Sequence, residues 1–282
     1  MAMTYTDFWR SLTPLYDPRE AQAVAQLILE QHFGRSLADV LCGSMPDDEQ
    51  LRPVIQRLLQ GEPVQYVLGE AEFCGLKFYV EPGVLIPRPE TQQLCDMAVE
   101  AYLATAGDGA ILDIGTGSGC IACTLAKRLP QAHVTAWDIS ADALRIARDN
   151  ALRLGVDVVF EQVDILSLAS SSHGQRIQQR YFQLIVSNPP YICQHEKGEM
   201  EPRVLDHEPA VALFVPDDDP LLFYRAIGSY AASALVYGGT LVVEINRQYG
   251  TAVADLLRQT GFACAAVVDD CYGNARFVKA TL

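Results

Sequence analysis

From residue 110 to the last residue, apolar runs of strand length alternate with helical patterns, and this alternation restricts the fold more than any other feature. Helical patterns follow the runs AILDI, HVTAWD, FQLIVS and GTLVVEI, whereas a polar loop follows DVVFEQ. Strands that alternate with helices predict a mostly parallel sheet covered on both faces. The closing runs FACAAVVDD and ARFVKATL have no helix between them, so they predict an antiparallel addition at the C-terminal edge of a seven-stranded sheet in an α/β fold.

The chain before this alternation has a different character. Up to about residue 61 the pattern is helical, and DPRE at 17–20 supplies a helix N-cap, a proline at the first helical position and a glutamate at the third. Between 72 and 87, apolar and aromatic residues alternate around two glycines, which predicts a β-hairpin. The predicted organisation is a small helical domain at 1–70, a β-hairpin linker at 71–88 and the α/β domain at 89–282.

Charge, apolar runs and cysteine usage narrow the functional classes. The net charge of −14 disfavours non-specific binding to nucleic acid, which depends largely on lysine and arginine. No secretion signal begins the sequence and no apolar run reaches the length of a membrane span, so we expect a cytoplasmic protein without a membrane partner. Eight scattered cysteines indicate reduced, mostly buried thiols. The only C-x-x-C pair, Cys120 and Cys123, lacks a second pair or nearby histidines, so we expect a packing role and no metal.

The run ILDIGTGSGCIACTLA passes from a buried strand into a helix through Gly115, Gly117 and Gly119. Glycines at such a turn allow positive φ and let a ligand touch the backbone, although an ordinary tight turn has the same appearance. A dinucleotide pattern G-x-G-x-x-G needs glycine at position 120, where this chain has Cys120. The loop therefore predicts a ligand without a diphosphate.

Two acidic residues follow the next two strands of the predicted sheet. Asp138 stands at the tip of the second strand, where a carboxylate can accept both ribose hydroxyls. Asp164 follows the third strand and can accept a hydrogen bond from an adenine amino group, with Ile165 packing on the ring. The carboxyl ends of parallel strands share one edge, so the ligand is a nucleoside such as that of S-adenosylmethionine. The pattern resembles class I methyltransferases, which have a Rossmann-like fold.

Asn188 follows the fourth strand, in VSNPPYI, and opens onto the same edge of the sheet. Its side-chain carbonyl and the Pro189 backbone carbonyl offer two acceptors for the two hydrogens of one planar NH₂ group. Holding both hydrogens aims the nitrogen lone pair at a methyl group, and the two bonds strengthen as the nitrogen becomes positive. Pro190 stiffens the turn, and Tyr191 can stack on the planar group. The alternative is a plain Asn-Pro turn with Tyr191 capping the core.

Two further polar residues lie near this edge in the predicted topology. His195 follows the motif closely, but amide methylation needs no strong base before attack, so we expect it at a loop surface. Glu244 ends the fifth strand, and it either faces the cleft or is an ordinary polar strand end.

NPPY resembles the motif shared by methyltransferases that act on glutamine amides, adenine N6 and cytosine N4. Five segments, one of which contains NPPY, resemble in order along the chain the bacterial peptide chain release factor glutamine methyltransferase family. These segments are GEPVQYVLGEAEFCGLKFYVEPGVLIPRPET, LDIGTGSGCIA, IVSNPPYI, HEPAVALF with LLFYRAI after it, and DDCYGNAR. The similarity covers nearly the whole chain and is least clear in the first sixty residues.

The resemblance implies a two-domain enzyme that uses S-adenosylmethionine to methylate the glutamine amide in the Gly-Gly-Gln loop of release factors. The helical domain then recognises the substrate, and the partners are release factors rather than nucleic acid. The cofactor residues implied are Gly115, Thr116, Gly117, Ser118, Gly119, Asp138, Asp164, Ile165 and Asn188. The substrate residues implied are Asn188, Pro189, Pro190 and Tyr191, of which Asn188, Pro189 and Tyr191 are catalytic.

This chain departs from the family at a few positions. Ile165 stands where an aromatic residue is frequent, Ser118 replaces a frequent threonine, and DDDP at 217–220 replaces a glycine-containing turn. The segment PRPET at 87–91 matches, and its residues alone predict only a rigid junction, with a part in the substrate cleft implied by the resemblance.

Other functions remain as alternatives to release factor methylation. A related enzyme methylates a glutamine of a ribosomal protein, and the hairpin and PRPET segment favour the release factor family over it. A DNA adenine methyltransferase should carry a basic target-recognition segment, which neither the charge nor the length of this chain provides. A non-enzymatic nucleotide sensor would not need the paired acceptors of NPPY.

Overall fold

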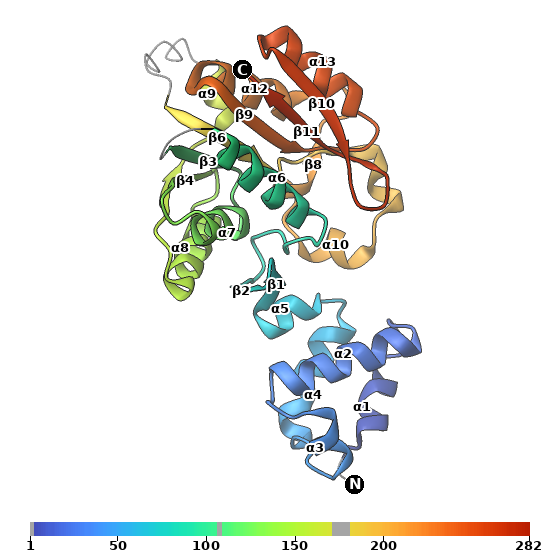
Figure 1. Ribbon diagram of the computed structural model, residues 1–282. Helices are drawn as coiled ribbons and strands as arrows, with labels where there is room; N and C mark the ends of the chain where they lie inside the picture. Colours follow the sequence, from blue (N-terminus) through green and yellow to red (C-terminus); the bar gives the residue numbers. More distant parts are fainter. Residues whose placement is uncertain (1–2, 106–108, 171–180) are drawn as a thin grey trace. The chain divides into compact units, whose positions relative to one another are not determined.

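The computed structural model describes residues 3–105, 109–170 and 181–282, which divide into two compact units (Figure 1). One unit contains the chain up to Glu70 together with Val80–Pro82 and Met200–Glu208. The other contains Ala71–Tyr79, Gly83–Glu199 and Pro209–Leu282. Within the described ranges, none of the helices combines the length and the apolar character that crossing a membrane requires.

The first unit is helical. Its helices are α1 (Tyr5–Ser11), α2 (Pro18–Gln31), α3 (Leu37–Leu41), α4 (Asp48–Leu59), α5 (Val64–Leu68) and α10 (Pro202–His207). Helix α2 begins as the sequence predicts, because the Asp17 side chain accepts hydrogen bonds from the backbone N–H groups of Arg19 and Glu20. The apolar faces of α1, α2 and α4 form a common core, whose fully buried members include Phe8, Leu12, Ile28, Leu29, Leu51 and Leu58.

Helix α10 belongs to the first unit although it lies far along the chain, a placement that the sequence pattern does not predict. Arg203 on α10 donates to Glu20 of α2 at 3.0 Å. The same guanidinium lies 4.6 Å from the centre of the Tyr16 ring. An ion pair and a cation–π contact thus attach α10 to this unit.

The second unit is built on a seven-stranded sheet, as the sequence predicts. Its strands are β3 (Ala110–Ile114), β4 (His133–Asp138), β5 (Val159–Gln162), β6 (Phe182–Ser187), β9 (Leu235–Glu244), β10 (Cys264–Asp269) and β11 (Ala275–Thr281). They lie in the order β10-β11-β9-β6-β3-β4-β5. Strands β9, β6, β3, β4 and β5 pair in parallel, and β11 is antiparallel to both of its neighbours. The predicted antiparallel addition is confirmed, with β11 as the reversed strand.

Helices cover both faces of this sheet (Figure 1). One apolar cluster involves α6 (Thr91–Ala104), α7 (Cys120–Arg128) and α8 (Ala141–Leu154), and the other involves α9 (Ile165–Ser170), α12 (Leu222–Ala234) and α13 (Gly250–Thr260).

Cys120 and Cys123 are buried in the first cluster, and burial raises the pKa of Cys123 to about 12. Four of the eight cysteines are buried, fewer than the sequence suggests, and all eight are free thiols.

The β-hairpin is shorter than the predicted span of 72–87. It consists of β1 (Glu70–Phe73) and β2 (Leu76–Tyr79). Both turn residues, Cys74 and Gly75, have positive φ, as a type I′ two-residue hairpin turn requires. The alternation of apolar residues continues beyond β2, but prolines interrupt it and the segment forms no strand.

Two loops also contain more structure than the sequence predicts. The polar loop after β5 begins with α9, before residues 171–180, which lie outside the described ranges. The segment after NPPY contains β7 (Ile192–Cys193), the 3₁₀ helix η2 (Gln194–Glu199), α11 (Ala210–Leu213) and β8 (Phe214–Val215). Strands β7 and β8 pair in parallel and hold this segment together.

Asn150 of α8 joins the hairpin to the loop after β3. Its carbonyl accepts from the Tyr79 N–H at 2.6 Å, and its amide nitrogen donates to the carbonyls of Tyr79 and Ser118, both at 2.9 Å. The side chain is fully buried. A buried amide that satisfies three backbone groups is costly to remove.

Asn150→Ala is therefore expected to lower the free energy of unfolding by roughly 2–4 kcal/mol, because one buried and two part-buried backbone groups lose a hydrogen bond to a buried amide. Urea denaturation measures this change. The matched control is Leu152→Ala on the same helix, where the side chain is 80% exposed and a change within about 0.5 kcal/mol is expected. Equal effects of the two substitutions would contradict the role of Asn150.

Candidate active site

The glycine loop joins β3 to α7 at the carboxyl edge of the sheet. Gly115, Gly117 and Gly119 have φ values of +76°, +55° and +80°, which favour glycine. A Cβ atom at Gly119 would lie 3.0 Å from the Cβ of Ala147, so this glycine permits close packing of α7 against α8. Cβ atoms at Gly115 and Gly117 would meet nothing within 4 Å. The first two glycines therefore expose backbone to a ligand, and the third serves packing.

Asp138 ends β4 beside this loop. Its carboxylate accepts hydrogen bonds from the N–H groups of Gly117 at 2.8 Å and Ser140 at 2.9 Å. Burial raises the pKa of Asp138, and the hydrogen bonds oppose that shift. Each carboxylate oxygen offers more than one lone pair, so Asp138 fixes the loop and keeps acceptor capacity.

Asp164 precedes α9, and its carboxylate accepts hydrogen bonds from the first turn of that helix. The carboxylate accepts from the Leu166 N–H at 2.9 Å and from the Ser167 hydroxyl. The Ser167 hydrogen bond is the largest cause of a lowered pKa at Asp164. Ile165 is 8% exposed and packs into the apolar cluster that involves α9, α12 and α13.

A cavity of about 240 Å³ lies at this edge of the sheet. The predicted site residues that line it are Gly115, Gly117, Asp138, Asp164, Ile165, Asn188, Pro189 and Pro190. Val84 and Leu85 from the segment after the hairpin, with Phe223 and Ile227 of α12, add apolar walls. The structure thus brings together residues from the ends of four strands, as the sequence predicts.

A second cavity of about 40 Å³ shares Asn188, Gly115 and Gly117 with the first. Its lining includes Thr116 and Ser118 of the glycine loop and the residues Pro87, Arg88 and Thr91 of PRPET. The sequence alone predicts only a rigid junction for PRPET, and the structure places this segment beside Asn188. Gly119 and Tyr191 line neither cavity.

Asn188 and Tyr191 of the NPPY motif are both attached to buried polar groups. The Asn188 amide nitrogen donates to the Thr91 hydroxyl at 3.3 Å. The Tyr191 hydroxyl donates to Glu244 at 3.0 Å, and burial raises its pKa. The Thr91 hydroxyl donates to the other oxygen of Glu244 at 2.7 Å. Glu244 lines neither cavity, so it does not face the cleft directly; it is a buried strand end whose carboxylate is bonded to Thr91 and Tyr191.

Sequence reasoning passed over Asp113, which lies in β3 just before the glycine loop. Its carboxylate is fully buried and accepts from the Thr116 hydroxyl at 2.7 Å, while its other oxygen has no hydrogen-bond partner within the described part of the chain. Burial raises the pKa of Asp113 to about 7. The signal that could have found it is an acid inside the apolar run AILDI.

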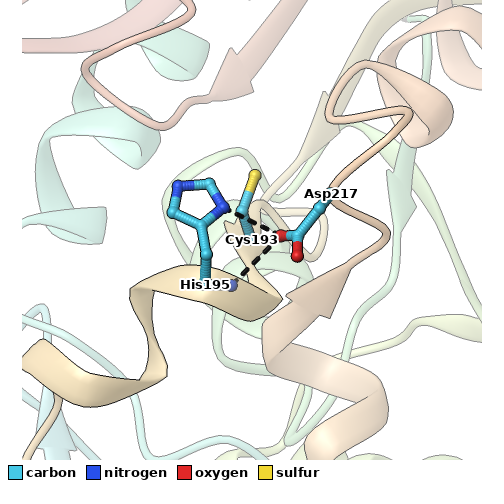
Figure 2. Close-up of side chains that lie close together, drawn as sticks. All are labelled: Cys193, His195 and Asp217. Atoms are coloured by element: carbon cyan, nitrogen blue, oxygen red, sulfur yellow. Dashed lines mark hydrogen bonds and ion pairs between the residues drawn. The ribbon is translucent and has the colours of Figure 1, made fainter.

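Cys193, His195 and Asp217 lie close together after NPPY, and Figure 2 shows their side chains. These three residue types can bind a metal ion. The His195 Nδ1 atom, however, already lies 2.9 Å from the Asp217 carboxylate, and the Cys193 sulfur lies 3.7 Å from the Tyr249 hydroxyl. Burial raises the pKa of Cys193, which favours the thiol over the metal-binding thiolate. The hydrogen bond between His195 and Asp217 and a buried thiol account for the cluster, and His195 is exposed at the surface.

The glycine loop, the acids at the strand ends and NPPY define a methyltransferase, and comparison with known proteins agrees. Residues 93–207 match the family described as "Methyltransferase small domain". The fold is shared with the T. thermophilus 16S rRNA N2 methyltransferase RsmC, solved in complex with AdoMet and guanosine. The TM-score is 0.50 with 18% identity, over 75% of this chain and 49% of that one. The Rossmann-like class I architecture is thus confirmed.

Relatives with higher sequence identity identify the family of methyltransferases to which this chain belongs. Residues 15–69 match the "PrmC N-terminal domain". The Bacteroides thetaiotaomicron release factor glutamine methyltransferase is 44% identical over 96% of both chains. The Flavobacterium psychrophilum protein of the same name is 40% identical over 97% of this chain and 96% of its own. This chain belongs to the release factor glutamine methyltransferase family.

Asp113→Asn is expected to remove part of the pH dependence of stability. A raised pKa in the folded state means that folding favours the protonated acid, so this residue's contribution is present below pH 3.8 and is lost as the pH rises through about 7. The wild-type protein should therefore lose on the order of 2–4 kcal/mol relative to D113N between about pH 4 and pH 8. Urea unfolding of both proteins at these pH values measures the difference. Parallel pH curves would contradict the assignment.

Proposed function

We propose that this protein transfers a methyl group from S-adenosylmethionine to the side-chain amide nitrogen of the glutamine in the Gly-Gly-Gln motif of peptide chain release factors. The orientation of Asn188 is the observation that supports this most directly. Its amide nitrogen donates to Thr91, which leaves its carbonyl oxygen for a substrate at the cavity wall. The names of relatives that match nearly the whole chain support the choice of substrate.

The lining of the cavity fits a nucleoside that carries no diphosphate. The exposed backbone of Gly115 and Gly117 admits close approach, and Asp138 at the next strand end suits the ribose hydroxyls. Asp164 and Ile165 then lie where an adenine would be held, with an aliphatic rather than an aromatic contact on the ring. S-adenosylmethionine supplies a methyl group activated by a positive sulfonium.

The reaction requires that a planar amide with a delocalised lone pair act as a nucleophile. In this proposal the glutamine NH₂ group donates one hydrogen to the Asn188 side-chain carbonyl and the other to the Pro189 backbone carbonyl. Both acceptors sit on a short, proline-stiffened segment directly after β6, so little reorganisation is needed as charge develops. The nitrogen–methyl bond forms as the methyl–sulfur bond breaks, and the positive nitrogen then loses a proton to water.

No dedicated base is assigned to this proton transfer. His195 is exposed and paired with Asp217. Tyr191, through its bond to Glu244, is held beside the acceptors and is assigned to the substrate amide with Pro190. The helical unit, which contains the match to the N-terminal family domain, is assigned to recognition of the release factor. Since release factors act on ribosomes, the reaction takes place in the cytoplasm.

Asn188→Ala is expected to lower kcat by about 10²- to 10³-fold because one of two acceptors for the nucleophile is lost. The Kd for S-adenosylmethionine should change much less. Steady-state methylation of a release factor and calorimetric cofactor titration measure the two quantities. Gln131→Ala, an exposed substitution near the opposite end of β4, is the control. A loss of cofactor affinity of the same size would contradict the role of Asn188 as an acceptor for the substrate amide.

Substrate choice is tested with labelled S-adenosylmethionine and four acceptors in separate reactions. These are a release factor, the same factor with its Gly-Gly-Gln glutamine changed to alanine, a ribosomal protein with a methylatable glutamine, and duplex DNA. Label is expected only in the unmodified release factor, because only it presents the amide in that loop. Labelling of DNA alone, or of the ribosomal protein alone, would overturn the proposed substrate.

A further inference from the structure

We infer that Glu244, acting through Thr91, sets the rotational state of the Asn188 amide, so that its oxygen rather than its nitrogen faces the substrate. This inference rests on the proposed function, since it assigns positioning residues to that site. Three buried or half-buried polar side chains, from three separate elements, form the path.

The path begins with the register of two neighbouring strands. Val243 of β9 pairs with Ser187 of β6, so the next residues, Glu244 and Asn188, leave adjacent strands at the same level. Thr91 is the first residue of α6. The side chains of Glu244 and Thr91 are 1% and 2% exposed. Solvent is therefore poorly placed to supply alternative partners for either group.

Donor and acceptor capacity fixes the direction of each hydrogen bond. An ionised carboxylate only accepts, and a threonine hydroxyl has one hydrogen to give. The Thr91 hydrogen goes to Glu244 at 2.7 Å, which leaves the Thr91 oxygen as an acceptor. The group that Thr91 meets on Asn188 at 3.3 Å must therefore be the NH₂. The Asn188 carbonyl then points to the other side.

The same carboxylate also holds the other end of the motif. Its second oxygen accepts from the Tyr191 hydroxyl at 3.0 Å. Burial raises the pKa of Glu244, whereas the hydrogen bonds from Thr91 and Tyr191 and the charge of Arg276, which bonds to Asp270 at 3.2 Å, favour its ionised form. One acceptor-only group thus orders both Asn188 and Tyr191.

An Asn188 amide turned by 180° would present two hydrogens to the two hydrogens of the substrate amide. The facing hydrogens would repel the substrate amide, and the substrate would lose the Asn188 carbonyl oxygen as an acceptor. Thr91 and Glu244 touch neither reacting atom in this account. They are positioning residues, and their effect should pass entirely through Asn188 and Tyr191.

Thr91→Val keeps the branched shape of the side chain and removes the hydroxyl, and it is expected to lower kcat on the order of 10- to 100-fold. Thr91→Ser keeps the hydroxyl and should recover most of that loss. The Kd for S-adenosylmethionine should stay within about threefold in both variants. Thermal unfolding of each variant verifies that it is folded.

A double-mutant cycle with Asn188→Ala tests whether Thr91 acts through Asn188. If it does, Thr91→Val has no further effect on kcat in the N188A background. Multiplicative losses would overturn the inference while leaving the proposed function intact, whereas the absence of methylation by the wild-type protein would overturn the proposed function itself.

Glu244→Gln provides a second cycle in case Thr91→Val is poorly folded. Thr91 and Tyr191 donate to different oxygens of Glu244, and a glutamine replaces one of these oxygens with an NH₂ donor, so one of the two hydroxyls loses its acceptor. We expect a loss of kcat on the order of 10-fold that shrinks by at least half, on a logarithmic scale, when Asn188 is already alanine. A loss of the same size in both backgrounds would contradict the inference.

Discussion

The parallel register of β3, β6 and β9 is the constraint on which the site depends. Ile114 pairs with Ser187, and Ser187 pairs with Val243, so the chain leaves three neighbouring strands at one level. The glycine loop and Asn188 follow directly after β3 and β6, and Glu244 is the last residue of β9. Main-chain hydrogen bonds of a sheet buried on both faces hold the exits in place, so the geometry of the site is largely a property of the sheet.

Burial of acidic side chains at this edge works against folding. Asp113, Asp138 and Glu244 are buried or half-buried, and burial raises the pKa of each. Hydrogen bonds from backbone N–H groups and hydroxyls offset part of this cost. The apolar clusters on the two faces of the sheet supply the stability that such a site consumes.

Local patterns predicted the strands of the sheet, most of the helices between them and the residues at the strand ends, because strands buried on both faces read as apolar runs. They could not show that Thr91 meets Glu244, because those residues are 153 positions apart and no local periodicity records that contact. For the hairpin, the local pattern was present without the structure. Apolar alternation continues beyond Tyr79, but prolines prevent strand pairing there, so the predicted hairpin is too long. Helix α10 was missed because its partners lie in another part of the chain.

The placement of α10 bears on how such a protein arises and changes. The chain enters the helical unit at its start, returns to it at Val80–Pro82, and returns again at Met200–Glu208 from the middle of the methyltransferase sequence. The helical unit is therefore not an appendage that a gene could gain or lose at one end. Exchange of this unit between relatives would have to bring an internal segment with it, so the two parts are expected to be inherited together.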